Sequence, residues 1–181
     1  LGHFRSLAQA SALPIIIEHN QSSIPDVSEA LVELARDSNV CGIVDATGDV
    51  ALNGELIRNT PDNFFVLTSR DVMMLPLMAL GVDGAVSTIA NAFPQECSDM
   101  MGQMAFGNFQ DAQTTHHSLA PLLRILELEG EASGIKAILN HFHWLENLVR
   151  LPNTPVSEET RTAIYKELAA LPQQMVENAM Q

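Results

Sequence analysis

Short apolar runs alternate with longer amphipathic segments along the first 107 residues. After an amphipathic stretch at 1–12, four runs have the length and β-branched content of buried strands, at 14–17, 40–44, 64–68 and 84–87. Helical spacing of apolar residues follows each run, at 28–36, 52–58, 71–80 and 92–106. Ser28 and Asp71 are suitable N-caps for two of these helices. Strand and helix therefore alternate four times, which predicts a parallel α/β sheet.

The pattern changes to helices alone after Gly107. Helices are predicted at 108–128, 134–144 and 157–171, and Pro152 and Pro155 break the chain between the last two. The segment after Pro172 is polar apart from three residues, so we expect it to fray.

Composition narrows the classes of partner. Apolar residues make up 46% of the 181 residues and the mean hydropathy is +0.10, as expected for a packed core. The chain has nine Lys and Arg residues and 22 Asp and Glu residues. The resulting net charge of -13 disfavours binding to nucleic acid and to anionic membrane surfaces. No apolar run approaches the ~20 residues of a membrane span. Two cysteines, Cys41 in a predicted strand and Cys97 on a predicted helix, provide no disulfide framework, so a cytoplasmic setting is expected.

One motif points to a specific family. Residues 40–49 read Val-Cys-Gly-Ile-Val-Asp-Ala-Thr-Gly-Asp. They resemble the strand-six signature of the dihydrodipicolinate synthase and N-acetylneuraminate lyase family, Gly-Ile-Lys-Glu-Ala-Thr/Ser-Gly-Asp. The resemblance implies a lysine that forms a Schiff base with pyruvate or another 2-keto acid. Val44 occupies the lysine position and Asp45 the glutamate position; because valine has no nitrogen, no imine can form there.

Further segments resemble the same family in the same order. They are the end of barrel helix four at 1–12, strand five at 13–17, the family segment that ends in Ser-Gly-Asp-Asp at 63–71, strand eight with its loop at 80–94, and parts of the C-terminal extension at 130–136 and 149–152. The resemblance implies the second half of a TIM (β/α)8 barrel followed by a C-terminal all-helical extension. Residues 1–107 would supply barrel elements, from the end of helix 4 through strand and helix 8, and residues 108–181 the helical domain. Four strands leave two unpaired edges, so we expect an N-terminal half or a second copy to cover them.

The departures from the family fall where its chemistry would be. The proton-relaying tyrosine of strand five is replaced by Glu18, or by His19 if the alignment slips by one residue. The arginine that holds the substrate carboxylate falls within 21–23, Gln-Ser-Ser, where there is no cation. By their positions in the family pattern, the residues expected to line the pocket are Glu18, Val44, Thr47 and Val86. The resemblance assigns no catalytic residue, no metal and no cofactor.

Several polar residues have two interpretations. Glu18 and His19 could form an acid/base or metal pair, or simply begin a solvated loop. Asp45 and Asp49 could hold a metal with Glu18, but the sequence favours a hydrogen-bonded turn residue for Asp45 and a helix cap for Asp49. The two histidine pairs of the helical part, His116 with His117 and His141 with His143, are expected to point apart. Both lysines of the chain, Lys136 and Lys166, fall on predicted helices outside the barrel.

Two functional hypotheses follow. The first is a non-catalytic lyase-family homologue that acts as a binding or assembly subunit. The alternative is an active lyase or aldolase on a 2-keto acid, using an unrecognised lysine or new chemistry from Glu18, His19 and Asp45. The partners expected are a small 2-keto acid or related metabolite and further copies of the chain in a homo-oligomer, with no nucleic acid and no membrane.

Overall fold

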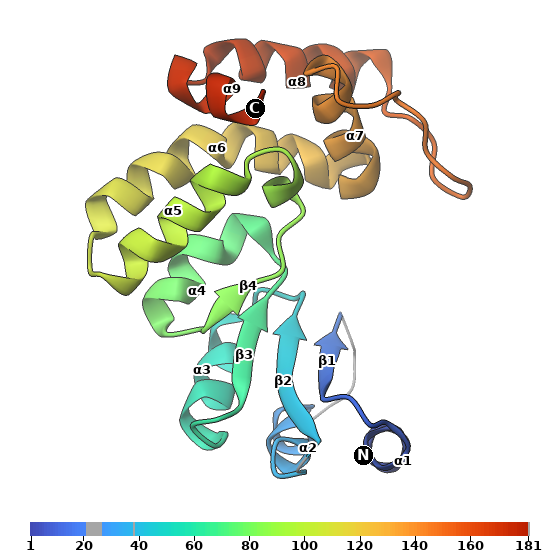
Figure 1. The fold of residues 1–181 in the computed structure, drawn as a ribbon, viewed down its shortest axis with the longest axis vertical. Helices are drawn as coiled ribbons and strands as arrows, with labels where there is room; N and C mark the ends of the chain where they lie inside the picture. The colour runs from blue at the N-terminus through green and yellow to red at the C-terminus, as the bar shows by residue number, and fades with distance from the viewer. Residues whose placement is uncertain (21–26, 38, 181) are drawn as a thin grey trace. The chain divides into compact units, whose positions relative to one another are not determined.

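A computed structural model describes residues 1–20, 27–37 and 39–180, which form two compact units, Leu1–Val86 and Ser87–Gln181 (Figure 1). The first unit contains α1 Gly2–Ala10, β1 Ile15–His19, α2 Val27–Leu34, β2 Val40–Asp45, α3 Val50–Asn59, β3 Phe65–Thr68, η1 Asp71–Met73, α4 Met74–Leu80 and β4 Gly84–Ala85. The second contains η2 Ile89–Asn91, α5 Pro94–Ala105, α6 Phe109–Glu129, α7 Glu131–His141, α8 Glu158–Ala170 and α9 Gln173–Ala179.

The four strands form a parallel sheet in the order β1-β2-β3-β4, so each strand pairs with its neighbour in sequence. Helices connect the strands, as parallel pairing requires. The predicted parallel α/β sheet is confirmed. The described residues leave the outer edges of β1 and β4 unpaired.

The hydrophobic core of the first unit lies between the sheet and its helices. Ile17, Ile43 and Val66 pair across neighbouring strands and are at most 4% exposed. They belong to one cluster with residues from all four helices, namely Ala8, Leu31, Leu34, Leu56 and Leu77. Because side chains alternate along a strand, this packing fixes which residues face away from the helices.

The second unit is a helical assembly with its own core. Phe93, ahead of α5, meets Phe142 edge to face with ring centroids 6.0 Å apart. The unit also buries side chains of α6, α7 and α8, which include Leu119, Leu122, Ile138, Ile164 and Leu168. The helix α5 packs against α6 within this unit. The predicted boundary at 107–108 refers to the complete barrel and stays a prediction.

Three details of the sequence prediction were wrong. Helix α2 includes Val27, so Ser28 lies inside the helix and is not its cap. Asp71 lies in the 3-10 turn η1, ahead of α4. The C-terminal segment forms helix α9, in which Ala179 is buried, and the Trp144 Nε1–H donates to the Ala179 carbonyl at 3.0 Å. The apolar residues of this short helix fall on one side, a pattern concealed by its polar composition.

Candidate functional site

Val44 lies at the carboxyl end of β2, on the sheet face away from the helices. Its neighbour Ile43 is fully buried in the helix-side core, whereas Val44 is outside that cluster, as strand alternation requires. In register, Val44 pairs with Glu18 on β1 and with Leu67 on β3. These three side chains therefore form one layer of the open face.

This layer combines one carboxylate with apolar side chains. Glu18 is exposed, Leu67 is half-buried and Val44 is 9% exposed. The next layer toward the amino ends of the strands contains Ile16 and Phe65, which are 47% and 51% exposed. The open face is thus apolar, with a negative charge near its carboxyl end.

The other two predicted pocket residues differ in how they are held. Val86 follows β4 by one residue, is 55% exposed, and donates its backbone N–H to the Thr68 carbonyl at 2.8 Å. Thr47 is half-buried in the turn after β2, where its hydroxyl donates to Asp45 Oδ1 at 2.8 Å. The hydroxyl also accepts from the Asp49 N–H at 3.1 Å. Thr47 therefore supports the turn, whereas Val86 is available at the rim of the sheet.

The turn after β2 is organised by the carboxylate of Asp45. Asp45 is fully buried, and its oxygens accept hydrogen bonds from the Thr47 N–H at 3.2 Å, the Thr47 hydroxyl, the Gly48 N–H at 3.0 Å and the Asn53 side-chain amide at 2.7 Å. Asp49 caps α3 by accepting from the N–H groups of Ala51 and Leu52. Asp45 is therefore a hydrogen-bonded turn residue and Asp49 a helix cap.

Glu18, His19 and Asp45 do not converge on one site. His19 pairs with Asp45 in register and is 9% exposed on the helix side, whereas Glu18 points to the opposite face of the sheet. Four hydrogen bonds already occupy the Asp45 carboxylate. Among the described residues, no group of three or more His, Cys, Asp or Glu is placed to hold a metal ion. Residues 21–23, where the family arginine would fall, lie outside the described part of the chain.

The comparisons with known proteins decide the family. The model of the Dihydrodipicolinate synthetase family matches residues 1–171. The chain belongs to the dihydrodipicolinate synthetase family. It is 34% identical over 172 residues to the 4-hydroxy-tetrahydrodipicolinate synthase of Phocaeicola vulgatus and 36% identical over 169 residues to that of Azobacteroides pseudotrichonymphae. The matches cover 93% and 92% of this chain, and 57% of each relative.

Solved synthase structures agree with the fold. The chloride-inhibited dihydrodipicolinate synthase of Acinetobacter baumannii, complexed with pyruvate, superposes with a TM-score of 0.87 at 30% identity. The Thermotoga maritima dihydrodipicolinate synthase gives 0.88 at 25%. Both matches cover 93% of this chain; they cover 58% of the Acinetobacter baumannii synthase and 59% of the Thermotoga maritima synthase. The predicted second half of a TIM barrel with a helical extension is confirmed.

The sequence analysis did not identify two residues that lie at or near the family site. Leu67 completes the layer with Val44, and its alternation within β3 could have revealed it. Asn53 is fully buried on α3 and holds both Asp45 Oδ2 and the Asp49 carbonyl. Its place one turn after the Asp49 cap is the only sequence signal that could have indicated this role.

Three of the histidines and lysines singled out in the second unit, His116, His141 and Lys136, have local surroundings that explain them. Burial lowers the pKa of His116, with a smaller effect from the adjacent His117. Burial also lowers the pKa of His141, whose ring lies 4.5 Å from that of Tyr165. The Lys136 ammonium donates to the Leu148 carbonyl on the loop after α7.

No helix among the described residues is long and apolar enough to cross a membrane.

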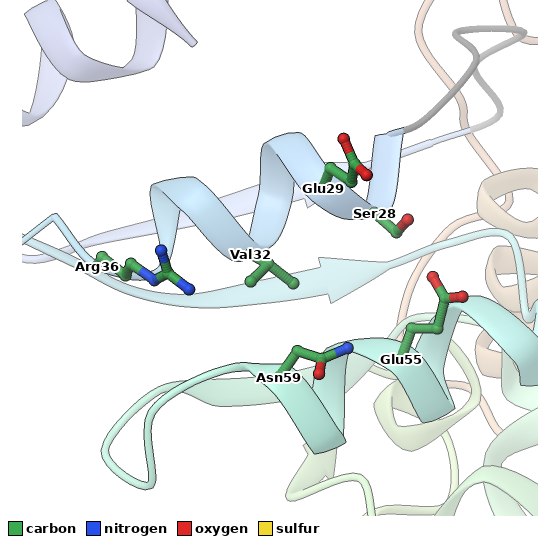
Figure 2. Close-up of a pocket in the computed structure, with 6 residues that line it drawn as sticks. All are labelled: Ser28, Glu29, Val32, Arg36, Glu55 and Asn59. Atoms are coloured by element: carbon green, nitrogen blue, oxygen red, sulfur yellow. The ribbon is translucent and has the colours of Figure 1, made fainter.

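A shallow groove between α2 and α3 lies in the helical layer. Figure 2 shows it lined by Ser28, Glu29 and Val32 of α2, by Arg36 just after that helix, and by Glu55 and Asn59 of α3. Its charges are mixed, and its walls belong to helices that cover the side of the sheet opposite Val44. The groove is thus separate from the layer that contains Glu18 and Val44.

Proposed function

We propose that this chain is the catalytically silent half of a lyase-family barrel and serves as a binding or assembly subunit. The observation that carries the proposal is Val44, inside the otherwise intact run Gly42-Ile43-x-x-Ala46-Thr47-Gly48-Asp49. A Schiff base requires an unprotonated amine within bonding reach of the substrate carbonyl. A valine at this position removes the covalent intermediate altogether.

The residue beside Val44 supports the same interpretation. Glu18 is its in-register partner, so the alignment that makes Val44 the lysine position also makes Glu18 the tyrosine position. A carboxylate there adds negative charge where an anionic 2-keto acid would have to bind. Since residues 21–23 contain no cation, that charge is not offset by the arginine of the family pattern.

The two lysines of the chain offer no substitute nucleophile on the sheet. Lys136 lies on α7 and Lys166 on α8, both in the second unit. Neither follows a strand end, where the functional residues of such barrels lie. The new-chemistry alternative also lacks support, because His19 and Asp45 face away from Glu18.

The open sheet supports the assembly part of the proposal. The edges of β1 and β4 carry unpaired backbone groups within the described residues, and Ile16, Phe65 and Val86 remain about half exposed. Unpaired strand edges and apolar sheet faces bind other protein segments. The remaining barrel half, and further copies of the protein in a homo-oligomer, are the occupants proposed for these surfaces.

Pyruvate turnover tests the proposal directly. The complete natural protein that contains this chain should consume no pyruvate above a buffer control, either alone or with an aldehyde co-substrate. An active 4-hydroxy-tetrahydrodipicolinate synthase in the same assay provides the positive control. Turnover above buffer would overturn the proposal and favour the active-lyase alternative.

A further inference from the structure

We propose that the groove between α2 and α3 binds a linear dipolar molecule of the ω-amino acid class, with its carboxylate at Arg36 and its ammonium at Glu29 and Glu55. The groove is separate from the strand-end face, so this inference goes beyond the proposed function and does not depend on it. Three features support it: the shape of the groove, the opposite charges at its two ends, and the lack of other partners for those charges.

Two helical stripes form the walls of the groove. Ser28, Val32 and Arg36 follow one another at intervals of four residues along α2 and the turn after it. Glu55 and Asn59 have the same spacing on α3. Because residues four apart lie on one face of a helix, each set presents its side chains to the same side. The groove has a volume of about 410 Å³, within the ~300–1,000 Å³ typical of small-molecule sites.

The charged residues lie at opposite ends of this groove. Figure 2 shows the Glu55 carboxylate directed toward the end of α2 that holds Ser28 and Glu29, with Arg36 beyond Val32 at the other end. Glu29 and Arg36 are seven residues apart in the sequence, which is two helical turns or ~10 Å along the axis. One end of the groove is therefore negative and the other positive.

The charges of the groove have no partners among the described residues. Two acids flank Arg36 closely in the sequence, but both bind a different arginine. Arg5 of α1 pairs with Glu33 at 2.7 Å and with Asp37 at 3.1 Å. The two glutamates at the other end likewise have no hydrogen bond or ion pair in the part of the chain that the structure describes. All three groups of the groove are thus available to a ligand.

The middle of the groove sets the body of the ligand. Val32 is half-buried there and packs against the core beneath α2. A methylene chain would bury against it while the ligand's two charged ends reach their counter-charges. A simple anion would meet the repulsion of two glutamates, and a simple cation would leave Arg36 unpaired. A molecule with one charge of each sign at its ends therefore fits best.

Three probes of matched length test the inference. Hexylammonium, hexanoate and 6-aminohexanoate share one six-carbon chain and differ in their terminal charges, and each is titrated into the complete protein with ligand-observed NMR. We expect 6-aminohexanoate to bind about fivefold tighter than hexylammonium, equivalent to about 1 kcal/mol, which an exposed ion pair can supply. Hexanoate should bind most weakly, and the affinity of 6-aminohexanoate should fall as the salt concentration rises.

Two variants assign the effect to the ends of the groove. Arg36→Gln should abolish the advantage of 6-aminohexanoate over hexylammonium and leave the affinity for hexylammonium unchanged. Glu55→Gln should weaken the binding of both amines. Arg58→Gln is the matched control, because this arginine of α3 is exposed and does not line the groove. All three residues are exposed, so their substitution should not unfold the protein.

Three results would overturn the inference: no saturable binding of 6-aminohexanoate, equal binding of 6-aminohexanoate and hexylammonium, or an unchanged preference in Arg36→Gln. A pyruvate adduct on a lysine is measured separately. It would contradict the proposed function and leave this inference standing, because the helices of the groove cover the side of the sheet opposite Val44.

Discussion

Val44 and Glu18 are adjacent in the sheet, so the effect of one depends on the other. The sequence motif was sufficient to predict that Val44 occupies a strand end, and the structure pairs it with Glu18 and Leu67. Pairing across strands depends on register, which only the three-dimensional arrangement provides. That is why Leu67 was not predicted although its own strand was.

Restoring the amine alone should not restore activity. In Val44→Lys, the neighbouring Glu18 carboxylate would raise the pKa of the new lysine and keep it protonated, which removes its nucleophilicity. The relay tyrosine is also missing, and general acid–base help is typically worth ~100- to 10,000-fold. Pyruvate turnover by this variant should therefore stay near background. Activity in the single variant would mean that only the nucleophile had been lost.

Among the polar residues of the turn after β2, Asp45 should be the one whose substitution lowers the stability of the protein most. Asp45→Ala leaves four donors without their acceptor, some of them buried, and should lower the free energy of unfolding by about 3 kcal/mol or more. The matched control Asp49→Ala removes only an exposed helix cap and should cost about 1 kcal/mol. Chemical denaturation measures both. Equal losses in the two variants would contradict the role given to the Asp45 carboxylate.

At the scale of elements, the start of α8 depends on the ionised form of Glu129. Its carboxylate accepts from the Thr160 hydroxyl at 2.5 Å and from the Ser157 hydroxyl and N–H, each at 2.7 Å. These bonds, chiefly that from Thr160, lower the pKa of Glu129. Because the pKa of Glu129 is lower in the folded protein than in the unfolded chain, its ionised form stabilises the fold at pH values above the ordinary glutamate pKa of about 4.3. This stabilisation is lost as the pH falls through the folded pKa.

Acidification should therefore loosen the first turn of α8. The protection factor of the Thr160 N–H, which is its exchange rate relative to the intrinsic rate at the same pH, should fall below about pH 4.3 in the natural protein. In the Glu129→Gln variant, the Thr160 N–H should already be less protected at neutral pH. Its protection should then change less when the pH is lowered. Glu146→Gln, a change at another exposed glutamate of the same unit, serves as the control. An unchanged pH profile in Glu129→Gln would contradict this account.

Elements with strong periodicity were predictable, and short ones were not. The four strands and the long helices follow from apolar spacing, since burial on one side imposes that spacing. Helix α9 was missed because seven residues hold few apolar positions, and its packing depends on Trp144 and Glu96, which are distant in sequence. Asn178 of α9 donates to Glu96 of α5 at 2.9 Å, a contact that no local pattern indicates.

At the scale of the whole molecule, the fold was predictable because several motifs occur in one order. The chain spans 57% of the Phocaeicola vulgatus synthase and 60% of the Methanosarcina mazei synthase, and its described residues contain four parallel strands. Exposed Ile16 and Phe65 face the side that a closed barrel would cover. The identity of a ligand follows less directly, because a barrel fold hosts many functions and only the site residues distinguish them.

The central claim is that no Schiff base forms on this chain, and borohydride trapping tests it most directly. The complete protein is incubated with pyruvate, reduced with borohydride and analysed by peptide mass spectrometry, with an active synthase treated in parallel. Our account predicts that the synthase gains mass on a lysine peptide and that the peptides containing Lys136 and Lys166 remain unmodified. A reduced pyruvate adduct on either lysine would contradict it.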